Sequence, residues 1–129
     1  MIYTTYFANL KRLRGVTPIA ICAKPPVGYT GLCYKQLAPP YATLVAYKDT
    51  LDQSEYIKSY NQAVLSRLDP SRVVRELSAL SQTKDFALVC YEKPDAFCHR
   101  HLVREWLIQN GFECEEYPNQ THNGGNNEQ

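Results

Sequence analysis

The stretch of the sequence that is richest in chemistry is residues 90–107, which read C-Y-E-K-P-D-A-F-C-H-R-H-L-V-R-E-W-L. Glu92 follows a strongly apolar run, while Cys98 and His99 each stand four residues before an apolar residue of a helical stripe. This spacing predicts that both project from the core-facing side of a helix's first turn, close to the strand end that carries Glu92. We expect the three side chains to line one pocket, where the positive end of the helix dipole favours an anion.

The residues alone leave three interpretations of this pocket open. In the first, Cys98 is a nucleophile activated by the helix dipole and by His99. In the second, Glu92 is the nucleophile or the general acid/base in chemistry at a sugar or a nucleobase. In the third, Cys98 is a small buried packing residue, His99 is held by a hydrogen bond, and Glu92 orders Arg100. The second interpretation is our leading hypothesis.

The cysteines and their neighbours also include residue types that ligate metals, namely Cys90, Glu92, Cys98 and His99, with His101 as a further candidate. Their spacing matches no zinc-binding pattern, so no metal site is predicted and no cofactor is assigned. The chain has five cysteines, an odd number, and none of them forms a C-x-x-C pair. This usage argues against a disulfide framework and predicts reduced thiols.

A second candidate region is the proline- and tyrosine-rich segment 24–41, which favours an extended loop. It interleaves Tyr29, Tyr34 and Tyr41 with Lys24 and Lys35, and aromatic rings with cations can stack a base and hold its phosphate. The alternative is that the tyrosines simply cover the loop against the domain. Residues 1–48 carry a net charge of +6 and residues 49–129 carry −5, and a basic half suits an anionic ligand.

The elements that must position these residues alternate between strands and helices. The expected strands are residues 2–7, 18–23, 43–47, 86–91 and an edge strand at 112–117. The expected helices follow N-caps at Asp52, Asp69 and Asp95, and the last helix ends at Asn110-Gly111. This pattern predicts a three-layer α/β domain of flavodoxin or Rossmann type, with a largely parallel sheet and a ligand site at the carboxyl ends of its strands.

Length and composition set the remaining limits. The 129 residues are 44% hydrophobic and 21% charged, which is typical of one globular domain. We expect that domain to span residues 1–117 and to be followed by a disordered polar tail at 118–129. No apolar run is long enough for a membrane helix, and the N-terminus lacks the pattern of a signal peptide. A cytoplasmic protein without a membrane partner is expected.

The segment 90–107 closely resembles the C-terminal signature of the family called domain of unknown function 488. Further similarities lie at Tyr3-Thr4, at Leu37-Ala-Pro39 and in the helix around residues 60–65. The resemblance implies an α/β fold of the flavodoxin or Rossmann kind, and it supplies no reaction. Its site candidates are Tyr3, Glu92, Cys98, His99 and Arg100.

The sequence also departs from this family in two places. Many relatives have Asp-Val-Arg where this chain has Ala20-Ile21-Cys22, and a serine where it has Pro40. If that Asp or Arg is catalytic in the relatives, this chain belongs to a divergent branch or lacks their activity.

These observations predict an enzyme that acts on a nucleotide, a nucleobase or another phosphate-bearing substrate derived from nucleic acid. Glu92 is the expected acid/base or nucleophile, His99 and Arg100 position the anion, and Cys98 is secondary. The alternative is a non-catalytic module that binds a nucleotide or nucleic acid in the same pocket. The expected partner is therefore a small anionic ligand or nucleic acid. The substrate-binding candidates are Arg100, Tyr3, Lys24, Tyr29, Tyr34 and Lys35.

Overall fold

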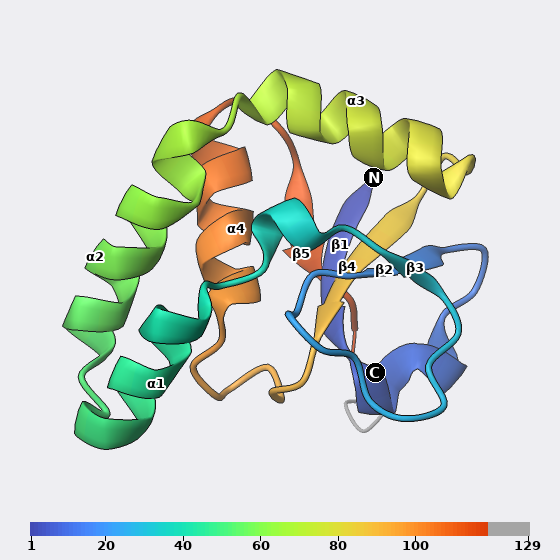
Figure 1. Cartoon of the computed structure of the whole chain (residues 1–129). Helices are drawn as coiled ribbons and strands as arrows, with labels where there is room; N and C mark the ends of the chain where they lie inside the picture. Colours follow the sequence, from blue (N-terminus) through green and yellow to red (C-terminus); the bar gives the residue numbers. More distant parts are fainter. Residues whose placement is uncertain (119–129) are drawn as a thin grey trace.

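The sheet at the centre of the molecule has five strands, all parallel, in the order β3-β2-β4-β1-β5 (Figure 1). The computed structural model describes residues 1–118, so the tail expected from residue 118 onward lies, apart from Pro118, outside the described residues. The strands are β1 (Ile2–Tyr6), β2 (Thr17–Ala20), β3 (Leu32–Cys33), β4 (Phe86–Cys90) and β5 (Cys114–Glu116). The helices are α1 (Tyr41–Thr50), α2 (Gln53–Ala63), α3 (Pro70–Ser81) and α4 (His99–Gln109), and the 3-10 segments are η1 (Phe7–Arg12), η2 (Lys35–Leu37) and η3 (Leu65–Arg67).

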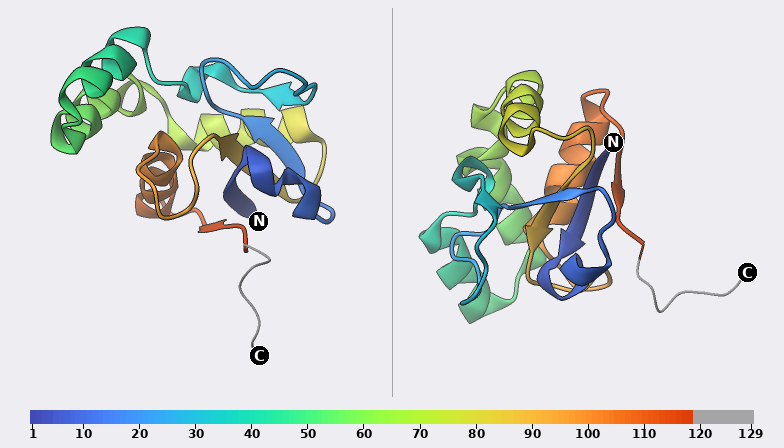
Figure 2. Two further views of the ribbon diagram at one scale, coloured as in Figure 1. Left: turned by 90° about the horizontal axis from the view of Figure 1, so that it is seen from below. Right: turned by 90° about the vertical axis from the view of Figure 1, so that its right-hand side faces the viewer.

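The predicted α/β class is confirmed, and the two faces of the sheet are covered unequally. Figure 2 shows α1, α2 and α4 on one side of the sheet and η1 on the other. On the second side, Asn9 of η1 donates from its amide to the hydroxyl of Thr5 at 3.1 Å. The layer on this face is therefore a short 3-10 segment.

The main hydrophobic core lies between the sheet and the helices. Strand β4 is buried at all five positions, as expected of a central strand covered on both faces. Completely buried residues of the core come from β2, β4, η2, α2, α3 and α4, and include Ile19, Leu88, Leu37, Tyr60, Val73, Leu77, Val103 and Leu107. The helices are thus held to the sheet by apolar contacts that fix where their ends lie.

The helix-boundary signals in the sequence are largely confirmed. Asp52 caps α2 by accepting a hydrogen bond from the Glu55 amide at 3.2 Å. Asp69 caps α3 by accepting from the Ser71 amide at 3.1 Å, and Pro70 occupies the first helical position. Gly111 follows α4 with φ +90°, a conformation that glycine adopts without steric cost.

The strand expected at residues 43–47 is wrong, because these residues lie within α1. Thr43 and Val45 are β-branched and suggest a strand, yet α1 begins after Pro40 and packs beside α2. The Thr43 hydroxyl lies 2.6 Å from that of Ser59 on α2. This tertiary contact helps to hold a helix against the local strand preference.

One helix boundary and one loop also differ from the prediction. Helix α4 begins at His99 with Cys98 as its N-cap, so the expected cap at Asp95 is wrong. The reason is local, since the Ala96 amide bonds to the carbonyl oxygen of Lys93 at 3.0 Å and closes a turn before the helix begins. The segment 24–41 also contains β3 and η2, although it is otherwise irregular, as expected.

The strand order opens a crevice between β2 and β4. These strands are neighbours, but the chain continues from β2 to β3 on one side and from β4 to β5 on the other. The connections that leave their carboxyl ends therefore diverge, which is the place where parallel α/β sheets bind ligands. Among residues 1–118, no helix is both long enough and apolar enough to cross a bilayer.

Candidate functional site

A cavity of about 600 Å³ lies at this crevice. Its floor is formed by the residues that follow β2 and by the end of β4, and its walls come from α1, α2 and the start of α4. The lining residues are Cys22, Ala23, Lys24, Pro39, Leu44, Tyr47, Lys48, Gln53, Tyr56, Cys90, Tyr91, Glu92, Ala96, Phe97, Cys98 and His99. A cavity of this size can accept a small organic ligand.

Four of the residues predicted from the sequence line this cavity, namely Lys24, Glu92, Cys98 and His99. Lys24 follows β2, and Glu92 lies in the loop of residues 91–98 that connects β4 to α4. Cys98 and His99 form the N-cap and first residue of α4. The strand end and the helix start therefore meet as the sequence pattern predicts.

Tyr3, Tyr29 and Lys35, which were also predicted to bind substrate, do not line the cavity. Tyr3 lies near the amino end of β1 and packs edge-on against Tyr117, with ring centroids 5.1 Å apart. The Tyr29 hydroxyl donates to a main-chain carbonyl of its own loop at 2.6 Å. Lys35 donates from Nζ to the carbonyl oxygen of Ala23 at 2.5 Å. In the described structure, these side chains hold the surrounding chain in place.

Tyr34 is likewise part of the core and does not reach the cavity. The residue is 8% exposed, and its hydroxyl donates to Oε1 of Glu76 on α3 at 2.5 Å. Burial, aided by that carboxylate, raises the pKa of Tyr34 above its usual value. Tyr34 therefore fastens the 24–41 segment to α3.

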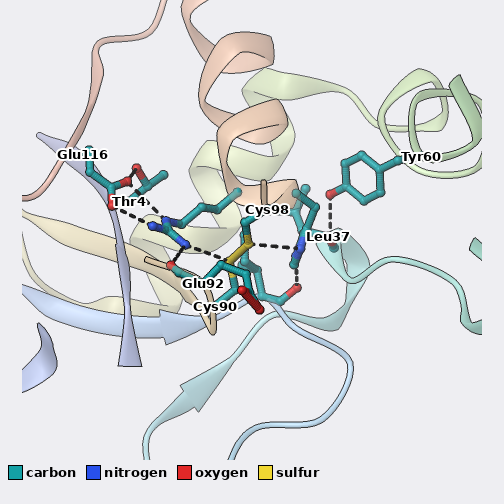
Figure 3. Close-up of a disulfide and its surroundings, with 10 residues drawn as sticks. Thr4, Leu37, Tyr60, Cys90, Glu92, Cys98 and Glu116 are labelled. Atoms are coloured by element: carbon teal, nitrogen blue, oxygen red, sulfur yellow. Dashed lines mark hydrogen bonds and ion pairs between the residues drawn. A yellow bond between two sulfur atoms is a disulfide. The ribbon is translucent and has the colours of Figure 1, made fainter. Parts of the chain in front are cut away.

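Arg100 is completely buried behind the cavity wall. Its guanidinium donates to both carboxylate oxygens of Glu116, at 3.2 and 2.8 Å, and Nη1 donates to the main-chain oxygen of Glu92 at 2.5 Å (Figure 3). Thr4 donates to the same Glu116 carboxylate at 2.6 Å. The expectation that Glu92 orders Arg100 is met only through the main chain, and the carboxylate partner of Arg100 is Glu116.

The Glu92 carboxylate is therefore available to contact a ligand in the cavity. It is exposed and lines the cavity, and no residue among 1–118 forms a hydrogen bond or an ion pair with its carboxylate. Arg100, by contrast, does not line the cavity and cannot contact an anion there directly. Its place is to hold the 91–98 loop from behind.

His99 has a fixed orientation. Its Nε2 donates to the main-chain oxygen of Ile21 at 2.8 Å, and its Nδ1 lies 3.9 Å from Sγ of Cys98. The ring of Tyr60 packs edge-on against the imidazole, with centroids 5.5 Å apart. Burial lowers the pKa of His99 to about 4, so the imidazole is neutral at pH 7.

The cysteines at the site are arranged differently from the expectation. The structure joins Cys90 and Cys98 in a disulfide (Figure 3), so reduced thiols are not confirmed for this pair. Cys22, Cys33 and Cys114 are free. The two paired residues are eight apart in sequence, a separation that no short motif marks, and they meet because β4 ends where α4 begins.

An aromatic wall of the cavity was missed by the sequence analysis. Tyr47 of α1, Tyr56 of α2 and Phe97 of the 91–98 loop contact one another, with ring centroids 5.0 to 5.4 Å apart. Tyr47 falls in the segment expected to be a strand, and Tyr56 lies in the helix expected after the Asp52 cap, so neither was predicted to line a pocket. The sequence signal for Tyr47 and Tyr56 would be two consecutive amphipathic helices that pack against each other. Lys48, one residue beyond Tyr47, lines the cavity as well.

A protein-family model matches most of the chain. The family model DUF488-N3a, described as the active DUF488-N3 subclade, matches residues 2–111. The matched region contains the whole cavity lining and ends just after α4. Neither a curated protein nor a solved structure matches the chain.

Proposed function

The chain belongs to the DUF488 family, and from that premise we propose that it is an enzyme whose substrate is a nucleotide or a related phosphate-bearing nucleobase compound. The observation that carries the proposal is the composition of the cavity at the crevice between β2 and β4. One wall is aromatic, two lysines line the cavity, and so does Glu92, whose carboxylate has no hydrogen-bond or ion-pair partner among residues 1–118. The description of the matched subclade as active agrees with catalysis.

The aromatic wall supports recognition of a planar base. Tyr47, Tyr56 and Phe97 expose aromatic surface to the cavity from three different segments. Bases stack on such side chains with about 1–3 kcal/mol each, and every base has a face suited to this contact. The wall thus supplies affinity without strong selection among bases.

The charged groups support recognition of a phosphate. Lys24 follows β2 and Lys48 lies in α1, both line the cavity, and helix α4 begins at its wall. The Cys98 side chain makes no capping hydrogen bond, so it does not compete for the amides of the first turn of α4. Lysines and the amino end of a helix both attract an anion.

Glu92 is the residue that we assign to the chemistry. A carboxylate in a ligand cavity can take or give a proton as the bond at a sugar or a base is broken. His99 and Arg100 act as positioning residues, because His99 ties the start of α4 to Ile21 and Arg100 ties the 91–98 loop to Glu116. They keep Glu92 at a fixed place relative to the aromatic wall.

The first experiment measures binding. Purified protein is screened for thermal stabilisation by nucleoside monophosphates, diphosphates and triphosphates and by the corresponding nucleosides, since a ligand that binds the folded state raises its stability. We expect nucleotides to stabilise the protein more than nucleosides do. Phe97→Ala should weaken the binding of the best nucleotide by roughly tenfold, because one stacking partner is lost.

The second experiment measures turnover of that nucleotide by chromatography of the reaction mixture. Glu92→Gln should abolish product formation while nucleotide binding persists. Asp95→Asn is the matched control, because Asp95 is an exposed acid on the same loop that does not line the cavity. Binding without any product in the unaltered protein would contradict catalysis and identify a non-catalytic binding module.

A further inference from the structure

Three metal-ligating atoms lie together in the wall of the cavity. Sγ of Cys90, Sγ of Cys98 and a ring nitrogen of His99 all lie within 4.8 Å of one another. All three residues are buried, with exposed fractions of 1%, 7% and 5%, and all three line the cavity. They come from the end of β4 and the start of α4, two elements fixed by the core.

The orientation of His99 suits a metal ligand. The Ile21 carbonyl oxygen, 2.8 Å from Nε2, can only accept a hydrogen bond, so the proton of the neutral ring is on Nε2. The lone pair of Nδ1 then faces Sγ of Cys98, 3.9 Å away. Metal-binding histidines in proteins are typically held in this way, with the other ring nitrogen donating to a carbonyl or carboxylate.

Arg100 suits a thiolate at Cys90. Its Nη1 lies 3.5 Å from Sγ of Cys90 and donates a hydrogen bond toward this sulfur, a contact that a metal-bound thiolate can also accept. The charge of Arg100 is itself balanced by Glu116. Two thiolates and one neutral imidazole would therefore leave a charge of −2 at the cluster, which a divalent cation neutralises.

The backbone separation of the two cysteines also fits a shared ion. Their Cα atoms are 7.6 Å apart, whereas disulfides usually have Cα atoms about 4.4–6.8 Å apart. Two sulfur atoms that each bind the same zinc ion at about 2.3 Å are held farther apart than two bonded sulfur atoms. A wider Cα separation accommodates that arrangement.

We propose that, in the reduced protein, Cys90, Cys98 and His99 bind one zinc ion. Zinc is the divalent metal that best fits two sulfur ligands and one nitrogen. A dithiol reductant supplies the two electrons and two protons that convert the disulfide into two thiols, and is itself oxidised to a disulfide. Zinc then displaces the two thiol protons and binds the thiolates. The fourth ligand position faces the cavity, where water or a substrate atom can occupy it.

The proposed zinc site goes beyond the nucleotide-binding function, and its test uses no nucleotide. The protein is reduced with a dithiol without oxygen, freed of reductant by gel filtration in metal-free buffer, and titrated with Zn²⁺ and, separately, Co²⁺. We expect one ion per chain, and for Co²⁺ the sulfur-to-metal charge-transfer absorption of thiolate ligands. Reduced, folded protein that binds neither ion, or binds Co²⁺ without this absorption, overturns the proposal.

Variants assign the ligands. Cys98→Ser and His99→Gln should each weaken zinc binding by at least about tenfold, and Cys98→Ser should lose roughly half of the Co²⁺ charge-transfer absorption. Cys33→Ser is the control, because Cys33 is an exposed free cysteine outside the cavity, and it should bind as the unaltered protein does. Unchanged zinc affinity in folded Cys98→Ser and His99→Gln refutes the assigned site. If a variant does not fold, the Co²⁺ spectrum of the unaltered protein decides.

Discussion

Arg100 is the charged side chain on which the rear of the cavity depends. Its side chain is inaccessible to solvent, whereas that of its carboxylate partner Glu116 is 23% exposed. A buried cation is tolerated only when its hydrogen-bonding groups are satisfied. Removing the partner carboxylate therefore leaves a charge that neither water nor protein compensates fully.

We predict that Glu116→Gln lowers the free energy of unfolding by about 3 kcal/mol, because the amide leaves the buried guanidinium of Arg100 without its counter-charge. Urea denaturation followed by circular dichroism measures the change. Glu115→Gln is the matched control, since Glu115 is the exposed neighbour on β5, and it should change stability by no more than about 0.5 kcal/mol. Equal effects of the two substitutions would show that the Arg100 pair contributes little.

His99 predicts how stability depends on pH. Its pKa falls from 6.5 to about 4 on folding, so between these values the unfolded chain binds a proton that the folded chain does not. The contribution of neutral His99 to the free energy of unfolding is therefore fully present above about pH 6.5 and is lost as the pH falls toward 4. The loss due to His99 is about 3 kcal/mol, and burial of His101, which also lowers its pKa, acts in the same direction.

The measurement is a series of urea denaturations between pH 7.5 and about 4, in the presence of a chelator. His99→Gln removes the titrating group and should flatten the decline in this window. If the variant and the unaltered protein lose stability in parallel, another group is responsible for the pH dependence.

At the scale of elements, the helix caps give a paired prediction. Asp69→Ala should lower the free energy of unfolding by about 1 kcal/mol, because the Asp69 carboxylate accepts the Ser71 amide at the start of α3. Asp95→Ala should leave stability within about 0.5 kcal/mol, because Asp95 caps no helix. Thermal or urea unfolding of both variants checks the difference, and a larger effect for Asp95 would contradict the observed start of α4.

The caps also show which parts of the fold the sequence can predict. Asp52, Asp69 and Gly111 act on the amides or the backbone angles of their own segment, so their effect can be predicted from the local sequence. Helix α1 is different, because its β-branched residues favour a strand and its packing against α2 decides otherwise. A contact between two segments cannot be read from either segment alone.

The same distinction applies to the candidate site. Glu92 and His99 were predicted to share a cavity, because Glu92 lies at the end of one strand and His99 at the start of the next helix. Tyr47 and Tyr56 were missed as cavity residues because α1 and α2 must fold back over the sheet to bring them there. The Cys90–Cys98 pair was missed because the sequence shows only the separation of these residues and not the path of the 91–98 loop.

At the scale of the whole molecule, the positive charge of residues 1–48 is spread over separate regions, and Lys35 lies in η2, outside the cavity lining. Lys11 and Arg12 lie in η1, on the sheet face opposite the α-helices, and Arg14 follows shortly after. Lys24 and Lys48 line the cavity. Only some of the basic side chains of residues 1–48 therefore lie at the cavity.

This division predicts how salt affects nucleotide binding. Binding should weaken as ionic strength rises, because added ions screen the attraction between phosphate and the exposed lysines. Lys24→Gln combined with Lys48→Gln should reduce both the affinity and its salt dependence, as measured by calorimetry at several salt concentrations. The control Lys11→Gln with Arg14→Gln removes equal charge away from the cavity, and an equal loss there would indicate a general charge effect.

The bonds of Arg100 link the cavity to a strand that does not touch it. Glu116 belongs to the edge strand β5, while the Glu92 carbonyl belongs to the loop that forms the cavity wall. If β5 separates from β1, Arg100 loses its carboxylate partner and its hold on the 91–98 loop weakens. Segments with few buried side chains open most easily in local unfolding, and only one of the three residues of β5 is buried. The amide hydrogens of β5 and of this loop should therefore exchange with solvent as one cooperative unit. The cavity wall then keeps its conformation only while β5 remains paired with β1.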